Sequence, residues 1–277
     1  MYHSKSMIRR IFVSACVLLS AAWSADAQSN LQREELCPNY TEIDPLIKCI
    51  EVESYAGLAK EIESAPSGAE ITFCPFFIRK ISSLRAITVK TGIKVTCARI
   101  SPDEFCTIVG LGTHLVINTS EDTRWQGFNF RESNDHAVHI SGDVENAELA
   151  THTFCQTSFV ENVRTKDTRG GALMLGRSAG TVNIVESFFK ENFSSTFGAA
   201  IYSRASQLNI IYSLFQKNKS NGYGPAVYTA QGGGLMIKTT TFLSNNGREG
   251  HDVAFNPGKQ EAIILSFCIP SENDMLY

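Results

Sequence analysis

Short apolar runs and turn residues alternate along the second half of the chain, and one pattern recurs there. It reads F-x-x-N, and its phenylalanines are 30, 26 and 27 residues apart. The copies are Phe159/Asn162, Phe189/Asn192, Phe215/Asn218 and Phe242/Asn245. Self-similarity at a nearly fixed period indicates a repeat architecture.

A second block follows each asparagine and begins with glycine. These blocks are Gly170–Leu173, Gly198–Tyr202, Gly224–Tyr228 and Gly250–Val253, and a degenerate fifth copy of the pattern spans Phe128–Ile140. Apolar, β-rich runs lie between the copies, at Val182–Val185, Leu208–Ile211, Leu235–Ile237 and Ala262–Leu265. Because glycine permits the positive φ of a tight corner, each repeat predicts a strand, an asparagine turn and a second strand entered through glycine.

The repeats predict an all-β fold, a single-stranded right-handed parallel β-helix (solenoid) of about seven to eight coils. Spacings of 26 to 30 residues leave no room for the helices of a doubly wound α/β fold. A propeller blade is also excluded, since it needs about 40–45 residues. A β-sandwich is the rival architecture, but hairpins every 8–12 residues or so would not explain a recurring F-x-x-N.

Parallel stacking of coils about 4.7–4.9 Å apart predicts columns of equivalent side chains. Phe159, Phe189, Phe215 and Phe242 should form one internal aromatic stack. Asn162, Asn192, Asn218 and Asn245 should form a ladder of amides that bond to one another and to the turn backbone. Ala172, Ala200 and Ala226 should form a column of small residues.

The region before the repeats predicts a cap and irregular first coils. Apolar residues in Val52–Ala65 recur at a helical period, so we expect one amphipathic helix over the open end of the solenoid. Strands are expected at Ala69–Cys74, Ala86–Val89, Ile93–Cys97, Thr107–Val109 and Leu115–Ile117. The resulting division is a signal peptide at 1–27, an N-terminal segment with the capping helix at 28–67, the β-helix at 68–268 and a tail at 269–277.

The N-terminus has the three parts of a secretory signal peptide. Lys5, Arg9 and Arg10 precede a twelve-residue apolar run, Ile11–Ala22, and Ala25–Ala27 forms an A-x-A cleavage site. The run is too short for a membrane anchor, which needs about 20 residues, and no later stretch is long and apolar enough. We therefore expect a secreted, extracellular protein with no membrane span after signal cleavage.

Cysteine usage agrees with an oxidising compartment. Cys16 leaves with the signal, and the seven cysteines that remain include five candidates for disulfides: Cys37, Cys49, Cys74, Cys97 and Cys106. Three pairings are open, namely Cys74–Cys97, Cys97–Cys106 and Cys37–Cys49. Because seven is odd, at least one thiol is left over or pairs with another chain. No C-x-x-C occurs, and we expect no metal and no other cofactor.

At this point the F-x-x-N and G-G-A or G-x-A blocks resemble the repeats of polymorphic outer membrane proteins. More broadly they resemble secreted right-handed β-helix proteins of the pectate-lyase-like superfamily. The resemblance covers roughly residues 68–268, although Gly-Gly-Ala is intact only at Gly170–Ala172. It implies polysaccharide lyases and hydrolases, adhesins, or proteins with no assigned activity, and the fold does not choose among them.

Carboxylates are the first place to look for catalysis, since a glycoside hydrolase needs two of them, about 5–9.5 Å apart. Glu161 and Glu191 precede ladder asparagines at equivalent positions and are weak catalytic candidates, with a solvent-facing turn column as the plainer interpretation. No aspartate pair with a basic residue marks a lyase. His136 and His139 are expected on opposite faces of an extended segment, too far apart to share a metal.

Four N-x-S/T sequons occur, and Asn39 and Asn118 are the glycosylation candidates because Asn192 and Asn218 are also ladder positions. The net charge of -3 and the absence of a basic stripe exclude nucleic acid as a partner. The leading hypothesis is a non-catalytic extracellular protein that is structural, adhesive or carbohydrate-binding, with polysaccharide or cell-surface components as partners. The alternative is a polysaccharide lyase or glycoside hydrolase of pectate-lyase-like type.

Overall fold

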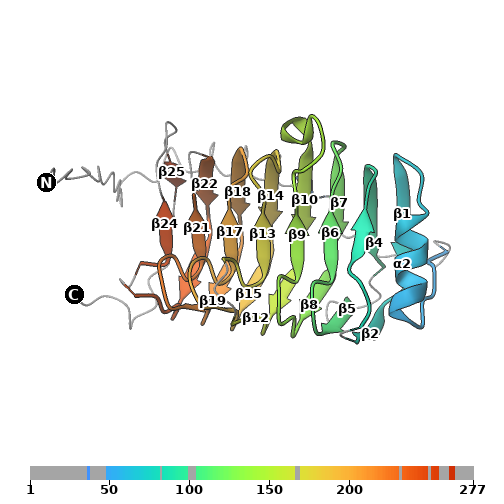
Figure 1. Ribbon diagram of the computed structural model, residues 1–277, viewed down its shortest axis with the longest axis horizontal. Coiled ribbons are helices and arrows are strands. Elements are labelled where there is room, and N and C mark those ends of the chain that lie inside the picture. The colour runs from blue at the N-terminus through green and yellow to red at the C-terminus, as the bar shows by residue number, and fades with distance from the viewer. Residues whose placement is uncertain are drawn as a thin grey trace, which may run out of the picture.

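The computed structural model describes residues 36–37, 48–81, 83–98, 104–165, 169–230, 233–248, 251–255 and 262–265. Within these ranges the chain winds into a parallel β-solenoid whose coils stack along the long axis of the molecule (Figure 1). The predicted all-β solenoid is confirmed. The expected signal peptide, the tail at 269–277 and the sequon at Asn39 lie outside the described residues.

Three long parallel sheets form the walls. Sheet A has eight strands: β1 (Ala69–Phe73), β4 (Ile93–Cys97), β7 (Thr123–Gln126), β10 (Thr151–Cys155), β14 (Thr181–Val185), β18 (Gln207–Ile211), β22 (Gly234–Lys238) and β25 (Ala262–Leu265). Sheet B has seven: β2 (Phe76–Lys80), β5 (Cys106–Gly110), β8 (Phe128–Arg131), β11 (Ser158–Val160), β15 (Phe188–Lys190), β19 (Leu214–Gln216) and β23 (Thr241–Leu243).

Sheet C also has seven strands: β3 (Ile87–Val89), β6 (Leu115–Ile117), β9 (Val138–Ile140), β13 (Leu173–Leu175), β17 (Ile201–Ser203), β21 (Val227–Thr229) and β24 (Val253–Phe255). A short sheet D lies between sheets B and C and holds β12 (Val163–Arg164), β16 (Phe193–Ser194) and β20 (Lys219–Ser220). Each coil adds one strand to A, B and C, so β1–β3 are the first set and β22–β24 the seventh.

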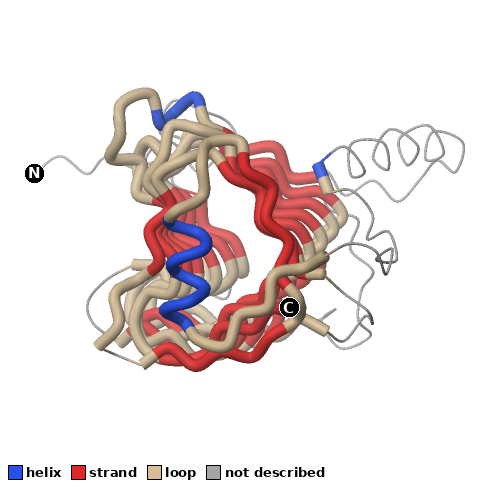
Figure 2. Tube along the Cα trace, turned by 90° about the vertical axis from the view of Figure 1, so that its right-hand side faces the viewer, coloured by secondary structure: helices blue, strands red, loops and turns tan. Residues whose placement is uncertain are grey.

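Two short helical segments of the described chain lie outside the sheets. Helix α2 (Tyr55–Glu63) lies across the N-terminal end of the solenoid, as predicted, and buries Leu58 and Ile62 against the first coil (Figure 2). It begins after Ser54, whose hydroxyl accepts a hydrogen bond from the Gly57 N–H and so caps the helix. A 3-10 turn, η1 (Ala147–Leu149), lies in the loop before β10.

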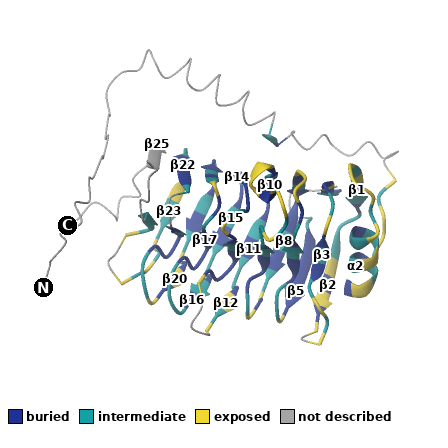
Figure 3. Ribbon diagram, turned by 45° about the horizontal axis from the view of Figure 1, so that its top comes forward, coloured by how far each residue is buried: buried dark blue, intermediate teal, exposed yellow. Residues whose placement is uncertain are grey.

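Inward-facing side chains alternate with outward-facing ones, so that the buried residues line the inside of every wall (Figure 3). The four repeat phenylalanines stack ring on ring down this core. The ring centroids of Phe159 and Phe189, and of Phe189 and Phe215, are 4.7 Å apart in each case, and Phe242 follows at 5.2 Å from Phe215. Ala172, Ala200 and Ala226 are fully buried as well.

The repeat asparagines form a hydrogen-bonded ladder. The amide Nδ2 of Asn192 donates to Oδ1 of Asn218, one coil further on, and to the Phe159 carbonyl, one coil back. Its Oδ1 accepts from both the amide and the backbone N–H of Asn162. All the hydrogen-bonding capacity of a fully buried side chain is therefore used, which buried polar groups require.

A left-handed residue precedes every rung of this ladder. Glu132, Glu161, Glu191, Lys217 and Ser244 have φ between 53° and 58°. This region of φ is unusual for residues with a Cβ. Its recurrence at one position in successive coils shows that the corner itself imposes it. The bend turns the chain at the end of sheet B and directs the next side chain inward, which is Ser133 after Glu132 and an asparagine in the four later coils.

A second ladder, of hydroxyls, lies at the corner between sheets A and B. Ser187 Oγ donates to the Val185 carbonyl and accepts a hydrogen bond from the Thr157 N–H of the previous coil. The same arrangement continues through Ser213 and Thr240. Each hydroxyl follows a left-handed residue and precedes the repeat phenylalanine by two positions, so the full repeat reads [ST]-x-F-x-x-N.

The ladder predicts that loss of an interior asparagine destabilises the fold more than loss of the last one. Replacing Asn192 by alanine leaves the buried Phe159 carbonyl and Asn162 N–H without these hydrogen-bond partners. We therefore expect the free energy of unfolding to fall by about 3 kcal/mol. Asn245→Ala removes a half-buried terminal rung and should cost about 1 kcal/mol. Urea denaturation of both variants measures the difference, and equal losses would contradict a cooperative ladder.

Candidate functional site

The carboxylates suggested by the sequence, Glu161 and Glu191, lie on adjacent coils and face solvent. Both occupy the left-handed corner position after sheet B. Glu161 pairs with Arg131 at 2.9 Å, and Glu191 lies 3.8 Å from both Lys190 and Lys217. The two carboxylates thus belong to a partly exposed row of alternating charges, which neutralises them.

The structure contains one of the three disulfide pairings that the sequence left open and replaces the other two. Cys97 and Cys106 are joined, which is one of the three expected possibilities. Cys74–Cys97 is wrong, because the register of β1 and β4 sets Phe73 opposite Cys97. Cys74 instead pairs with Cys49, since Ile50 bridges to Phe73 and brings that segment alongside β1.

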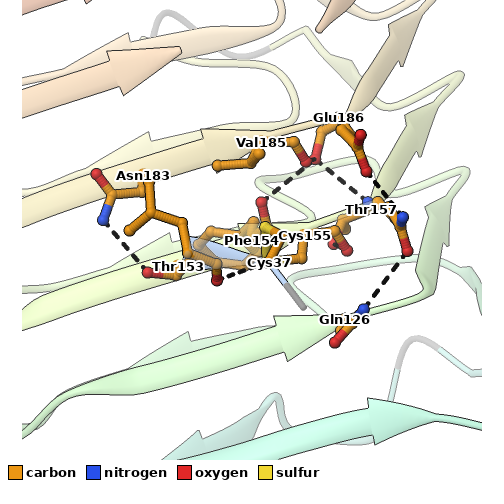
Figure 4. Close-up of a disulfide and its surroundings, with 12 residues drawn as sticks. Cys37, Gln126, Thr153, Phe154, Cys155, Thr157, Asn183, Val185 and Glu186 are labelled. Atoms are coloured by element: carbon orange, nitrogen blue, oxygen red, sulfur yellow. Dashed lines mark hydrogen bonds between the residues drawn. A yellow bond between two sulfur atoms is a disulfide. The ribbon is translucent and has the colours of Figure 1, made fainter. Parts of the chain in front are cut away.

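The expected Cys37–Cys49 bond is also wrong. Cys37 is joined to Cys155 at the end of β10, 118 residues away (Figure 4). The bond lies on the outer face of sheet A, where Cys37, Cys155, Val185 and Ile211 form an apolar cluster separate from the core. Sequence spacing carries no signal for this bond, because the two cysteines are 118 residues apart and Cys37 lies outside the repeats.

His136 and His139 were expected on opposite faces, and this is wrong. Their ring centroids lie 5.7 Å apart. Strand β9 begins only at Val138, so the strict alternation of a strand does not extend back to His136. The His136 Nδ1 bonds to the Gly170 carbonyl, and Arg164 forms an ion pair with Asp135 beside it. Burial lowers the pKa of both imidazoles, to about 3 for His136.

No metal-binding group stands out in the described part of the chain. There, no three His, Cys, Asp or Glu side chains come close enough together to hold an ion. Two carboxylates, Asp135 and Asp143, lie near the histidine pair, and Asp135 is engaged by Arg164.

An aromatic cluster covers the outer face of sheet C, and the sequence analysis missed it. Tyr202 and Tyr228 occupy equivalent outward positions of β17 and β21, and their parallel rings stack with centroids 5.5 Å apart. Phe197 and Tyr223, from the loops that enter these strands, stack on them, with Phe197 4.7 Å from Tyr228 and 5.8 Å from Tyr223. The signal was present, since tyrosine ends both the Gly198–Tyr202 and the Gly224–Tyr228 blocks.

A cation borders this cluster. The Arg169 guanidinium lies over the Tyr202 ring, 5.5 Å from its centroid, and donates to the Tyr202 hydroxyl at 3.0 Å. Tyr202 is buried beneath its neighbours, whereas Phe197, Tyr223 and Tyr228 are partly exposed. The outer face of sheet C therefore offers aromatic surface beside a positive charge and hydroxyl donors.

A groove lies elsewhere, at the corner between sheets A and B. It has a volume of about 530 Å³ and is lined by Glu186, Ser187, Phe188, Tyr212 and Leu214. Tyr212 also packs on the apolar cluster around Cys37, so the groove lies next to the disulfide on the outside of sheet A.

The sequons differ sharply in accessibility. Asn192 and Asn218 are fully buried in the ladder, so the folded protein cannot carry glycans there. Asn118 is half-buried at the end of β6, where Ser141 Oγ donates to its Oδ1 at 2.6 Å. Of the two glycosylation candidates, only Asn118 falls within the described residues, and its modification remains a prediction.

The row of alternating charges predicts that neutralising one of its carboxylates has little effect on stability. Glu161→Gln and Glu191→Gln each remove a partly exposed ion pair, so we expect the unfolding free energy to change by less than about 1 kcal/mol. Urea denaturation at neutral pH tests this. A loss as large as that of Asn192→Ala would show that the row supports the corner.

The buried histidines predict acid sensitivity. Burial lowers the pKa of His114 and of His152 to about 4, from 6.5. Between these values the unfolded chain binds protons that the folded imidazoles do not, so stability falls as the pH drops from about 6.5 to 4. Each histidine should contribute a slope of about 1.4 kcal/mol per pH unit. Urea denaturation of wild type and His152→Gln across this window measures it, and identical slopes would contradict the assignment.

Comparison with known proteins finds no similar protein. No family model, curated protein or solved structure matches the chain. Membership of the pectate-lyase-like or polymorphic outer membrane groups therefore has only the short repeat motifs in its favour and stays a prediction. Among the described residues, no helix has the length and apolar character needed to cross a membrane.

Proposed function

We propose that this protein is a secreted, non-catalytic β-solenoid that binds a polysaccharide or a related cell-surface component along the outer face of sheet C. The observation that carries the proposal is the cluster of Phe197, Tyr202, Tyr223 and Tyr228 with Arg169. A contiguous group of partly exposed aromatic side chains marks a surface that can bind a partner. The solenoid supplies a rigid support on which successive coils repeat the same outward position.

The chemistry of the cluster suits a sugar chain. The C–H face of a pyranose ring is apolar and packs on an aromatic ring, while its hydroxyls need hydrogen-bonding partners at the rim. Tyr223 and Tyr228 combine a ring with a hydroxyl, and Arg169 adds a donor for a hydroxyl or carboxylate oxygen. Because Tyr202 and Tyr228 hold equivalent positions in two adjacent coils, the cluster favours a ligand that crosses both coils along the solenoid axis.

Three disulfides in the described residues support an extracellular location, since such bonds persist in oxidising compartments. The expected signal peptide is consistent with this. The lyase or hydrolase alternative gains no support from Glu161 and Glu191, whose carboxylates pair with neighbouring cations.

The test is binding of the purified, secreted chain to a panel of neutral and acidic polysaccharides. Wild type should bind at least one polymer, and Tyr223→Ala with Tyr228→Ala should weaken that binding at least tenfold, because the exposed rings are lost. Tyr212→Ala is the matched control, since it removes an aromatic ring at the corner between sheets A and B.

Two outcomes would overturn the proposal. One is the absence of binding to every polymer, or binding that the double tyrosine variant leaves unchanged. The other is depolymerisation of a polysaccharide by wild type that is lost in Glu161→Gln or Glu191→Gln, which would establish the enzyme alternative.

A further inference from the structure

The outward positions of sheet C form one continuous column across four coils. His139, Met174, Tyr202 and Tyr228 are register partners, and each is the middle residue of its strand. Strands β9, β13, β17 and β21 lie side by side along the solenoid (Figure 1). At about 4.8 Å per coil, His139 is about 10 Å from Tyr202 and about 14 Å from Tyr228 along the axis. The aromatic cluster is therefore one end of a longer surface.

The other end of this surface is polar, and its side chains are not used by the fold. Within the described residues neither ring nitrogen of His139 makes a hydrogen bond, and neither is enclosed in the interior. Asp143 is half-buried in the loop after β9 and forms no ion pair with another described residue. Burial lowers the pKa of His139, and the nearby carboxylate of Asp143 opposes that shift.

His136 adds an acceptor next to these groups. Its Nδ1 lies 2.9 Å from the Gly170 carbonyl oxygen. Since a carbonyl only accepts, Nδ1 carries the proton and Nε2 keeps its lone pair. Burial lowers the pKa of this imidazole to about 3, so the ring is neutral at neutral pH. The ring centroids of His136 and His139 lie 5.7 Å apart, which puts both imidazoles at the same end of the column.

We infer that His136, His139 and Asp143 form a polar subsite for the hydroxyls of a neutral sugar chain that also covers the aromatic cluster. The inference rests on the function proposed for sheet C and specifies its ligand. The ligand would lie along the column, with its apolar ring faces on the tyrosines and its hydroxyls at the polar subsite.

The groups present match sugar hydroxyls, each of which both donates and accepts a hydrogen bond. The Asp143 carboxylate and the His136 Nε2 accept, and a neutral His139 ring has one donor and one acceptor nitrogen. Met174 lies between the polar subsite and Tyr202, where its flexible thioether chain gives an adaptable apolar contact. A chain of about four sugars, at about one sugar per 4.8 Å coil, would cover the whole column.

The charge of the polar subsite favours a neutral ligand over an acidic one. Arg164 is paired with Asp135, so the Asp143 carboxylate is the charge that a ligand meets there among the described residues. A uronate or sulfate group would place a like charge against it, which opposes binding. Arg169 lies over the Tyr202 ring at the aromatic end, about two coils away from the subsite, and does not cancel that repulsion.

Binding to matched polymer pairs tests the charge preference. The pairs are hydroxyethylcellulose with carboxymethylcellulose, and galactan with polygalacturonate. Wild type should bind the neutral member of a pair at least tenfold more tightly, and Asp143→Lys should abolish or reverse this preference. Glu145→Lys is the matched control, because it makes the same charge change at an exposed position in the same loop, and it should keep the preference. Tighter wild-type binding of the acidic member, or an unchanged preference in Asp143→Lys, overturns the inference.

A second variant tests the hydrogen bonds without changing a charge. His139→Phe keeps an aromatic ring and removes both nitrogens, so a hexasaccharide of the bound neutral polymer should bind about fivefold more weakly, the worth of one hydrogen bond. A disaccharide is too short to reach from the tyrosines to the subsite, and its affinity should not change. Urea denaturation checks that the variant is folded. Equal hexasaccharide affinity in wild type and His139→Phe contradicts the polar subsite.

The same titrations separate this inference from the function on which it rests. If Tyr223→Ala with Tyr228→Ala weakens binding while Asp143→Lys and His139→Phe do not, the polar subsite is wrong and the proposed function stands. If wild type binds no polymer, or the double tyrosine variant binds as wild type does, both fail.

Discussion

The inward-pointing polar side chain after a left-handed residue is the interaction on which the solenoid depends. It occurs at two corners of each regular coil, as asparagine between sheets B and C and as serine or threonine between sheets A and B. A corner buries backbone groups that cannot join a strand ladder, and each must find a partner. The side chains supply those partners and reach the next coil at the same time, so they satisfy the corner and set the register.

The aromatic core follows from that register. Because the ladders hold equivalent positions one above another, the phenylalanines two and three positions away stack at 4.7 to 5.2 Å without further specification. The ends of such a structure need separate treatment, since the last coil has no neighbour on one side. Helix α2 covers the first coil, and the bond from Cys49 to Cys74 holds the preceding segment against it.

With the interior committed to stacking, differences between coils are confined to the outer faces. Two of these faces depart from a plain polar surface. Sheet C carries stacked tyrosines with an arginine, and the outside of sheet A carries an apolar cluster clamped by the Cys37–Cys155 bond. They lie on different walls, so a ligand on one need not affect the other. This division is typical of repeat proteins, in which the core residues are uniform and the binding residues lie on the surface.

The sequence by itself determined the fold class, the capping helix and most strand positions, because stacking demands the same residue at the same place in every coil. Ile93–Cys97 and Leu115–Ile117 were predicted to the residue, and the Phe and Asn columns are visible as a period. The hydroxyl column recurs in four coils and the outward tyrosine in two, so both could have been found by aligning the repeats. The Cys37–Cys155 bond, the approach of His136 to His139 and the groove beside Leu36 were decided only by the tertiary structure. Each of them joins loops or segments that occur once, and a contact made once leaves no period in the sequence.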